Sequence, residues 1–168
     1  LLLFRSLTYF RKVEDKARGD DLEGRHLDMP VDGFDVILQD GQRLKGKQFT
    51  NSINSENTFV FCLSTGLDEE LFDEFQCDLC IEISDVAQFL SRCSREIKRL
   101  SDCEHVSFGH VEYYQFDKKT KRSIKQPVNI PLFKPSAYSR QREFRIYFAV
   151  ANGLQLTKTI RIEGNPFN

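Results

Sequence analysis

Residues 143–150 have the sequence EFRIYFAV, in which bulky apolar side chains alternate with polar ones. Because successive side chains of a β-strand point to opposite faces, this stretch is expected to form a strand with one apolar face. That apolar face carries Phe144, Ile146 and Phe148. The opposite face carries a polar row: Gln141, Glu143, Arg145 and Tyr147. Such a row indicates a cleft if the strand is central in its sheet, whereas on an edge strand it only faces solvent.

Turn signals and short apolar runs predict the other strands. Asp40-Gly41 predicts a hairpin between residues 34–38 and 43–49, and Asn152-Gly153 predicts that residues 154–162 turn back against the strand at 143–150. Further strands are expected at residues 1–4, 58–63, 77–83, 106–116 and 122–130. Loops are expected at residues 18–24, 51–57 and 117–120, because these stretches are polar and rich in turn-forming residues.

Three segments have helical spacing. The clearest is 85–100, which follows Ser84 as its expected cap and places apolar residues along one stripe. This stripe contains Val86, Phe89, Leu90, Cys93, Ile97 and Leu100. Ser6 is expected to cap a helix that stops near Gly19, and Thr65 or Asp68 to cap a helix that ends near Phe75. These elements predict an α+β fold, with one domain over residues 1–168, a mainly antiparallel sheet and two or three helices.

The composition fits a protein with a substantial core. Of 168 residues, 40% are hydrophobic, yet no apolar run approaches the roughly 20 residues that span a bilayer, so no membrane partner is expected. The five cysteines are an odd number spread singly along the chain, which indicates reduced thiols and a cytoplasmic location. The chain does not begin with Met, so we expect residues to precede Leu1 in the full protein.

The charge is distributed unevenly although the net charge is only −1. Residues 118–161 contain eleven Lys and Arg and a single acid, Glu143, whereas residues 1–117 contain 13 basic and 23 acidic residues. A carboxylate alone among cations is either salt-bridged or kept for chemistry. The basic segment could attract nucleic acid, helped by the aromatic residues near it, namely Tyr113, Tyr114, Phe116, Tyr138 and Tyr147. Alternatively, the two halves neutralise each other within one fold.

The cysteines and histidines give a weak zinc signal. Cys77-x-x-Cys80 supplies one close pair, but a second tight pair is absent unless Cys103-x-His105 is counted. Cys80 belongs to an expected strand and Cys93 to the apolar stripe of the expected helix, so both are interpreted as small core residues. We therefore expect no structural zinc.

The acidic loop Asp20-Asp21-Leu22-Glu23 is a possible Mg²⁺ site for phosphodiester hydrolysis. Such sites usually combine acids with a lysine on neighbouring strands, and no strand pair of that type is present in the sequence. Exposed acidic runs are more often plain surface. No metal is expected, and a metal-dependent nuclease is the third hypothesis for function.

Three short blocks carry the remaining polar signals. Arg5 and Ser6 follow Phe4 at the expected passage from strand to helix. Ser64-Thr65 closes the strand at 58–63 just before the next helix, and Gln141-x-Glu143 opens the strand at 143–150. Two-residue spacing in a strand places Gln141 and Glu143 on one face.

In order and local context these blocks resemble the Arg, Ser-Thr and Gln-x-Glu motifs of ADP-ribosyltransferases. Most of the chain also resembles a family of uncharacterised bacterial proteins found in abortive-infection and phage-defence settings. That second resemblance rests on the opening strand and helix, the loop Arg18–Gly24, Cys62-x-Ser64, and the segment from Tyr138 to Arg145. Gly66-Leu67 departs from the transferase pattern, in which further serines often follow Ser-Thr.

The transferase resemblance implies NAD as co-substrate, with a protein or nucleic-acid acceptor. Glu143 would hold a ribose hydroxyl and stabilise the oxocarbenium-like state, and Gln141 would position the acceptor. Arg5, beside Ser6, would hold the pyrophosphate or ribose, while Ser64 braces Glu143 with Thr65 beside it. On this hypothesis Arg5, Ser64 and Glu143 converge in one cleft, and Glu143→Gln leaves folding nearly unchanged.

Two other interpretations stay open. The runner-up is a non-enzymatic sensor or nucleic-acid-binding module that uses the basic segment 118–161. The other is that these polar residues have structural roles only. Arg5 would then pair with an acid at the sheet edge, Ser64-Thr65 would only cap a helix, and Glu143 would bridge Arg142 or Arg145.

Overall fold

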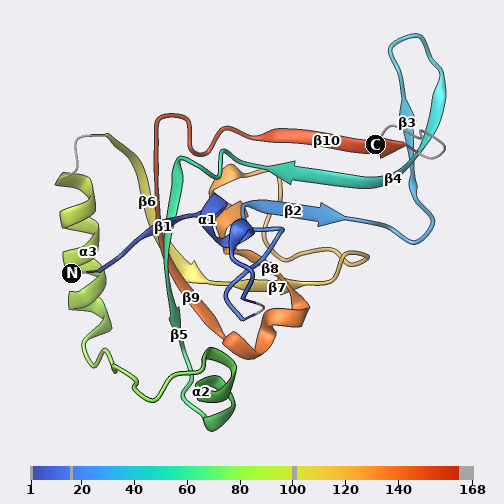
Figure 1. Ribbon diagram of the computed structural model, residues 1–168. Helices are drawn as coiled ribbons and strands as arrows, with labels where there is room; N and C mark the ends of the chain where they lie inside the picture. Colours follow the sequence, from blue (N-terminus) through green and yellow to red (C-terminus); the bar gives the residue numbers. More distant parts are fainter. Residues whose placement is uncertain (1, 16, 100–101, 163–168) are drawn as a thin grey trace.

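Strand β9 (Glu143–Val150) lies inside a four-stranded antiparallel sheet in the computed structural model, which describes residues 2–15, 17–99 and 102–162 (Figure 1). The strand order is β1-β5-β9-β6. The three partners are β1 (Arg5–Ser6), β5 (Thr58–Ser64) and β6 (Cys103–His110). The polar row of β9 therefore lies on an inner strand, and the α+β class with mainly antiparallel sheet is confirmed.

The register places the polar residues of β5 and β9 on one face. Ser64 lies opposite Glu143, and Cys62 lies opposite Arg145. Residues directly opposite each other in an antiparallel pair project to the same side. The sheet thus has one apolar face and one face that is polar where β5 ends beside the start of β9.

The apolar face is covered by α3 (Val86–Arg99), which packs on β9 and β6 (Figure 1). Its buried residues Leu90, Cys93 and Ile97 contact the cluster around Ile146 and Phe148. Val86, expected on the buried stripe, is 51% exposed, Phe89 is half-buried, and Leu100 lies outside the described residues. The helix is capped one residue later than expected, because Asp85 Oδ1 accepts a hydrogen bond from the Gln88 N–H at 2.9 Å.

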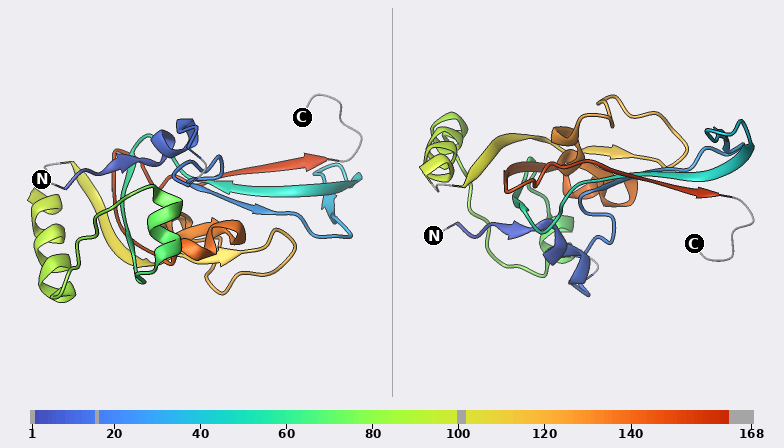
Figure 2. Two further views of the ribbon diagram at one scale, coloured as in Figure 1. Left: turned by 60° about the horizontal axis from the view of Figure 1, so that its bottom comes forward. Right: turned by 90° about the horizontal axis from the view of Figure 1, so that it is seen from above.

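A second antiparallel sheet extends away from the first and elongates the molecule (Figure 2). Its order is β10-β4-β2, with β3 also paired to β4. The strands are β2 (Arg25–Asp28), β3 (Phe34–Ile37), β4 (Arg43–Ser52) and β10 (Thr157–Ile162). The Asp40-Gly41 hairpin is confirmed, with Gly41 at φ +85°. The predicted pairing of the last two strands is wrong, because β10 pairs with β4 and not with β9, and β4 continues into the expected loop.

The polar face of the first sheet is covered by short elements that enclose a second core. Leu7 of α1 (Leu7–Lys12), Ile130 of η1 (Pro127–Leu132) and Phe133 of β8 (Phe133–Pro135) are buried there with Tyr147. The expected strand at 122–130 is wrong, since Pro127 and Pro131 favour the 3-10 turn η1 over a paired strand. β7 (Glu112–Tyr114) pairs in parallel with β8, and η2 (Ser136–Gln141) leads into β9.

Two caps agree with the sequence. The Ser6 hydroxyl accepts a hydrogen bond from the Tyr9 N–H at 3.4 Å and caps α1 as expected. The expected end of this helix near Gly19 is wrong, because α1 already ends at Lys12, where the backbone turns extended at Val13. Asp68 caps α2 (Glu69–Phe75), so the aspartate and not Thr65 is the capping residue. The expected strand at 1–4 is wrong, because residues 2–4 are not paired and the short strand β1 forms only after them, at Arg5–Ser6; Leu1 lies outside the described residues.

The expected strand at 77–83 is also wrong. This segment joins α2 to α3 without pairing to any described strand, and Cys77 and Cys80 are exposed. Its apolar residues Leu79 and Ile81 are 73% and 83% exposed. Among the described residues, no helix combines the length and apolar character that crossing a membrane would require.

Candidate functional site

A pocket of about 320 Å³ opens on the polar face of the first sheet, where β5 and β9 meet α1, α2 and the loop at 17–23. The side chains of Leu3, Phe10 and Phe75 contribute apolar walls. The polar lining residues are Arg18, Glu23, Cys62, Ser64, Lys134, Gln141, Glu143 and Arg145. We call this the Glu143 pocket. The polar row of β9 therefore faces a pocket, as its position on an inner strand predicts.

The floor of the Glu143 pocket is a buried ionic network. The Glu143 carboxylate is 6% exposed and receives the Lys134 ammonium on one oxygen and the Arg145 Nε–H on the other, at 2.7 Å. Lys134 also donates to Gln141 Oε1 at 2.7 Å. Buried charges persist only when they are paired and hydrogen-bonded, and each of these is.

Arg145 connects the sheet to the acidic loop. Its guanidinium is 1% exposed and forks onto both carboxylate oxygens of Glu23, at 3.0 and 2.5 Å. It also donates to the Pro131 carbonyl at 2.8 Å. Lys134 and Arg145 therefore balance Glu143 and Glu23, which makes a network of two cations and two anions with no net charge.

The network sets the protonation of its acids. Burial alone would raise the pKa of Glu143, but the charges of Arg145 and Lys134 outweigh it and lower the pKa to about 2. Among the described residues, no cation forms an ion pair with the neighbouring Asp20, and its Oδ2 finds no hydrogen-bond partner there. Burial and the charge of Glu23 raise the pKa of Asp20 to about 6.

Cys62 opens into the same pocket, but it is not an activated nucleophile. Although the side chain is exposed there, the protein that encloses the pocket raises the pKa of its thiol to about 12. The reactive form of cysteine is the thiolate. At neutral pH Cys62 is therefore a neutral polarisable side chain beside Arg145.

Ser64 and Thr65 fix the chain that leads into Glu143. The Ser64 hydroxyl donates to the Gln141 carbonyl at 3.0 Å or to the Gly66 carbonyl at 2.9 Å, and Thr65 donates to the Arg142 carbonyl at 3.0 Å. Arg142 itself has left-handed backbone geometry, with φ +44°. Ser64 therefore acts on the backbone before Glu143 and not on its carboxylate, and Thr65 is exposed outside the pocket lining.

Gly66 departs from the transferase pattern for a steric reason. A Cβ atom at this position would lie 2.3 Å from Cζ of Arg142, whose guanidinium crosses the glycine and pairs with Asp68. Any larger residue would displace that guanidinium.

Gln141 is held from three sides. Its Nε2 donates to the Ala17 carbonyl at 2.7 Å and to Glu74 at 2.9 Å, while its oxygen accepts from Lys134. The side chain is 2% exposed and has no donor left for an acceptor substrate. Gln141 is thus a positioning residue that ties Lys134 to α2 and to residue 17.

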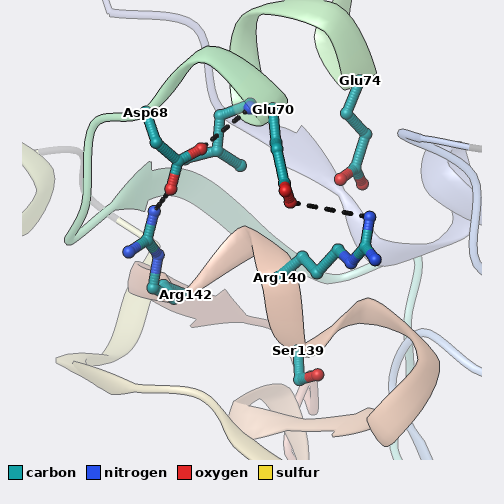
Figure 3. Close-up of a pocket in the computed structure, with 7 residues that line it drawn as sticks. Asp68, Glu70, Glu74, Ser139, Arg140 and Arg142 are labelled. Carbon is teal, nitrogen blue, oxygen red and sulfur yellow. Dashed lines mark hydrogen bonds and ion pairs between the residues drawn. The ribbon is translucent and has the colours of Figure 1, made fainter.

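A shallow hollow of about 270 Å³ beside this network shows how η2 is held against α2 (Figure 3). Arg142 pairs with Asp68, and Arg140 reaches Glu70 at 3.6 Å. All four side chains are substantially exposed, so these pairs contribute at most about 1 kcal/mol each. Their role is to place Gln141 and Glu143.

Arg5 and Ser6 lie outside the Glu143 pocket. Arg5 is exposed and covers the ring of Tyr9, with its guanidinium carbon 4.7 Å from the ring centroid, while Ser6 caps α1. The expected convergence of Arg5 with Ser64 and Glu143 is therefore wrong. Besides Lys134 and Arg145 of the buried network, the pocket is lined by a third cation, Arg18, which is held by Asp15 and by the Phe75 carbonyl at 2.7 Å.

The pairing of Glu143 with Arg145 agrees with one of the structural alternatives, whereas Lys134 and Glu23 were not expected there. Both come from other segments of the chain, 9 and 120 residues away from Glu143 in sequence. A signal was present: a single acid in a strongly basic segment requires a cation beside it. That signal does not say which cation.

In the described part of the chain, four of the eleven cations of the basic segment form internal ion pairs. Lys134, Arg140, Arg142 and Arg145 all contact acids from inside or outside the segment. Four of the remaining cations, Lys118, Lys119, Lys121 and Arg122, line a separate open hollow of about 760 Å³. Of the nearby aromatics only Phe116 is markedly exposed, at 37%, since Tyr114 and Tyr147 are buried and Tyr113 and Tyr138 are half-buried.

The expected acidic surface loop is only partly exposed. Asp21 faces solvent, but Asp20 and Glu23 are buried. Within residues 2–15, 17–99 and 102–162, no three His, Cys, Asp or Glu side chains are grouped as metal ligands. Cys93 is buried on α3 as expected, whereas Cys80 is exposed and not a core residue.

Comparison of the chain with protein-family models, with curated proteins and with solved structures returns no match. The functional argument therefore rests on the Glu143 pocket and on the chemistry of its side chains.

Proposed function

We propose that the Glu143 pocket binds a nucleotide of the NAD class and that the protein transfers ADP-ribose from it. The observation that carries this proposal is an ionised glutamate at the floor of a pocket with aromatic walls. Binding pockets for small molecules are usually of this size and combine apolar walls with a few fixed polar groups. Phe10 and Phe75 would contact a flat ring of the ligand.

Glu143 keeps the capacity to take a ribose hydroxyl. An ionised carboxylate accepts about four hydrogen bonds. Lys134 and Arg145 occupy one position on each oxygen of Glu143. A hydroxyl can therefore donate to Glu143 while both cations stay in place.

The reaction would use the charge of this carboxylate. The C1′–N bond to nicotinamide breaks and its electron pair leaves with the ring nitrogen, so positive charge develops on the ribose. Glu143 would stabilise that charge. The acceptor, a protein or nucleic-acid group, then forms the new bond to C1′ and loses its proton. Arg18 at the mouth would hold the pyrophosphate.

A paired substitution tests this proposal through the two arginines. Arg18→Gln removes the exposed cation at the mouth of the pocket and leaves Lys134 and Arg145 in place. It is expected to weaken NAD binding by roughly tenfold, the effect of about one charge-assisted contact. Arg5→Gln removes a similar exposed cation outside the pocket and is expected to leave the affinity unchanged. Calorimetric titration with NAD measures both.

Nicotinamide release by the unmodified chain, assayed with protein and nucleic-acid acceptors, completes the experiment. Binding without release would reduce the proposal to a nucleotide sensor. Equal effects of the two arginine substitutions would show that the Glu143 pocket is not the binding site, and absence of binding would reject the proposal.

A second candidate function, binding of single-stranded nucleic acid, is favoured by the cations of the open hollow at residues 118–122. Contacts to phosphate release counterions, so the logarithm of the affinity should fall with the logarithm of salt concentration with a slope of roughly −0.7 per contact. Replacing Lys118, Lys119, Lys121 and Arg122 by Gln should flatten that slope by up to about 3. Fluorescence anisotropy with a labelled oligonucleotide provides the measurement, and binding that ignores salt would contradict this candidate.

A further inference from the structure

The segment between α2 and α3 has the composition of a strand but no strand partner. Residues 78–83 read DLCIEI, and Leu79 and Ile81 are 73% and 83% exposed. No hydrogen bond joins the backbone of residues 78–84 to the rest of the described chain. An exposed apolar segment with free N–H and C=O groups is a template for pairing with another strand.

The charge of this segment limits which strand can pair with it. Residues 68–85 contain eight acids and no Lys or Arg. Asp78 and Glu82 flank the exposed apolar pair and are themselves exposed. Like charges placed opposite each other destabilise a strand pair, so two copies of 78–83 repel one another. The matching strand is therefore basic and partly apolar.

The chain itself carries such a strand. β10 reads TKTIRI and lies at the edge of its sheet, where no described strand pairs with its outer side. Lys158 and Arg161 are exposed, and Ile160 is 37% exposed. Two copies of β10 would repel each other for the same reason as two copies of 78–83.

We propose that residues 78–83 of one chain pair with β10 of a second copy. The two segments lie at opposite ends of the molecule, with the α2–α3 connection at lower left and β10 at upper right (Figure 1). Residues 78–83 therefore cannot reach β10 of the same chain. The contact uses different surfaces on the two copies, so it is head-to-tail and extends to rings or chains.

Two exposed substitutions, one on each strand, test the assembly. Ile81→Lys places a cation in the acidic segment, where it would repel the cations of β10. Ile160→Glu places an acid in β10, where it would repel the acids of residues 78–83. Sedimentation velocity from about 10 µM to about 1 mM covers the range of weak interfaces. The unmodified chain is expected to exceed its 19.6 kDa mass as concentration rises, and to return to it at high salt.

The decisive measurement is the mixture of the two variants. Each variant alone is expected to stay monomeric, because each has lost one of the two matching strands. An equimolar mixture is expected to assemble at least to a dimer, since the Ile81→Lys copy keeps its β10 and the Ile160→Glu copy keeps its residues 78–83. A mixture that stays monomeric, or a single variant that still assembles, would overturn the proposal.

Far-UV circular dichroism checks that both variants fold. If either is altered, Glu82→Arg and Arg161→Glu replace them, and the double variant with both changes is then expected to assemble because the charges are exchanged. The assay contains no nucleotide, so its outcome is independent of NAD binding.

Discussion

Replacing Arg145 by Met is expected to lower the free energy of unfolding by about 5 kcal/mol or more, because breaking one buried ion pair already costs about 3–5 kcal/mol and this change breaks two. Met has a similar volume and leaves little cavity. What it leaves is Glu23 without its cation and Glu143 with Lys134 alone. Since whole domains are stable by only about 5–15 kcal/mol, the variant should be unfolded or nearly so.

Arg142→Met is the matched control for this prediction. It removes the same type of side chain three residues earlier, but Arg142 is 44% exposed, and among the described residues its ion-pair partner is the equally exposed Asp68. An exposed pair contributes about 0–1 kcal/mol, so the free energy of unfolding of this variant should be close to that of the unmodified chain. Urea unfolding followed by circular dichroism compares the two. Equal losses would show that the Arg145 network is not a main source of stability.

The features predicted best from the sequence are those that depend on residues close together in the chain. The alternation in 143–150 determines the two faces of β9, and Asp40-Gly41 determines its hairpin because a turn residue with positive φ is needed there. The α3 stripe holds at Leu90, Cys93 and Ile97 for the same local reason. The stripe does not predict Val86 correctly, since this first residue of α3 is 51% exposed.

Strand partners were predicted less well, because local propensity does not specify them. A strand does form after the turn at Asn152-Gly153, at Thr157–Ile162 within the expected 154–162, but its partner is β4, about 110 residues earlier. Residues 77–83 have strand composition and find no partner in the described chain. Within the expected strand at 122–130, Pro127 argues against strand pairing, and so does Pro131 directly after it. The apolar pattern of this segment obscured both signals.

The candidate site was predicted in part. Glu143, Gln141 and Ser64 do come together, since they lie on or next to paired strands whose register follows from the pattern of faces. Arg5 lies opposite Val60, on the same face of the sheet as Glu143, but its guanidinium covers the ring of Tyr9 and does not line the pocket. The motif position alone does not specify that contact. Arg18 comes from a loop, where its guanidinium is held by a local pair with Asp15 and by the distant Phe75 carbonyl.

Glu143→Gln should destabilise the fold by about 3–5 kcal/mol, which replaces the expectation from sequence that folding is nearly unaffected. The substitution keeps shape, but it leaves Lys134 and Arg145 facing Glu23 as the only anion of the network. One buried positive charge then lacks compensation. Urea unfolding at neutral pH measures the loss.

The pH dependence of this loss follows from the pKa of Glu143. Its pKa is about 2 in the fold, below the ordinary value of 4.5, so the ionised form stabilises the folded state. That stabilisation is complete above pH 4.5 and disappears as the pH falls towards 2. The difference in stability between the unmodified chain and Glu143→Gln should therefore shrink over this range. A constant difference would mean that the carboxylate charge is not involved.

Adding Lys134→Met to Glu143→Gln should restore most of the lost stability, because one cation and one anion are then removed together and Arg145 stays paired with Glu23. This folded double variant separates the structural role of Glu143 from its chemical role. If the carboxylate stabilises charge on the ribose, nicotinamide release should stay about 10²–10³-fold below the unmodified rate although the fold is recovered. Lys134→Met alone gives the contribution of the lysine to that rate. A double variant that is both stable and fully active would assign Glu143 to the scaffold of the pocket, and the Glu143 pocket would then be a binding site without chemistry.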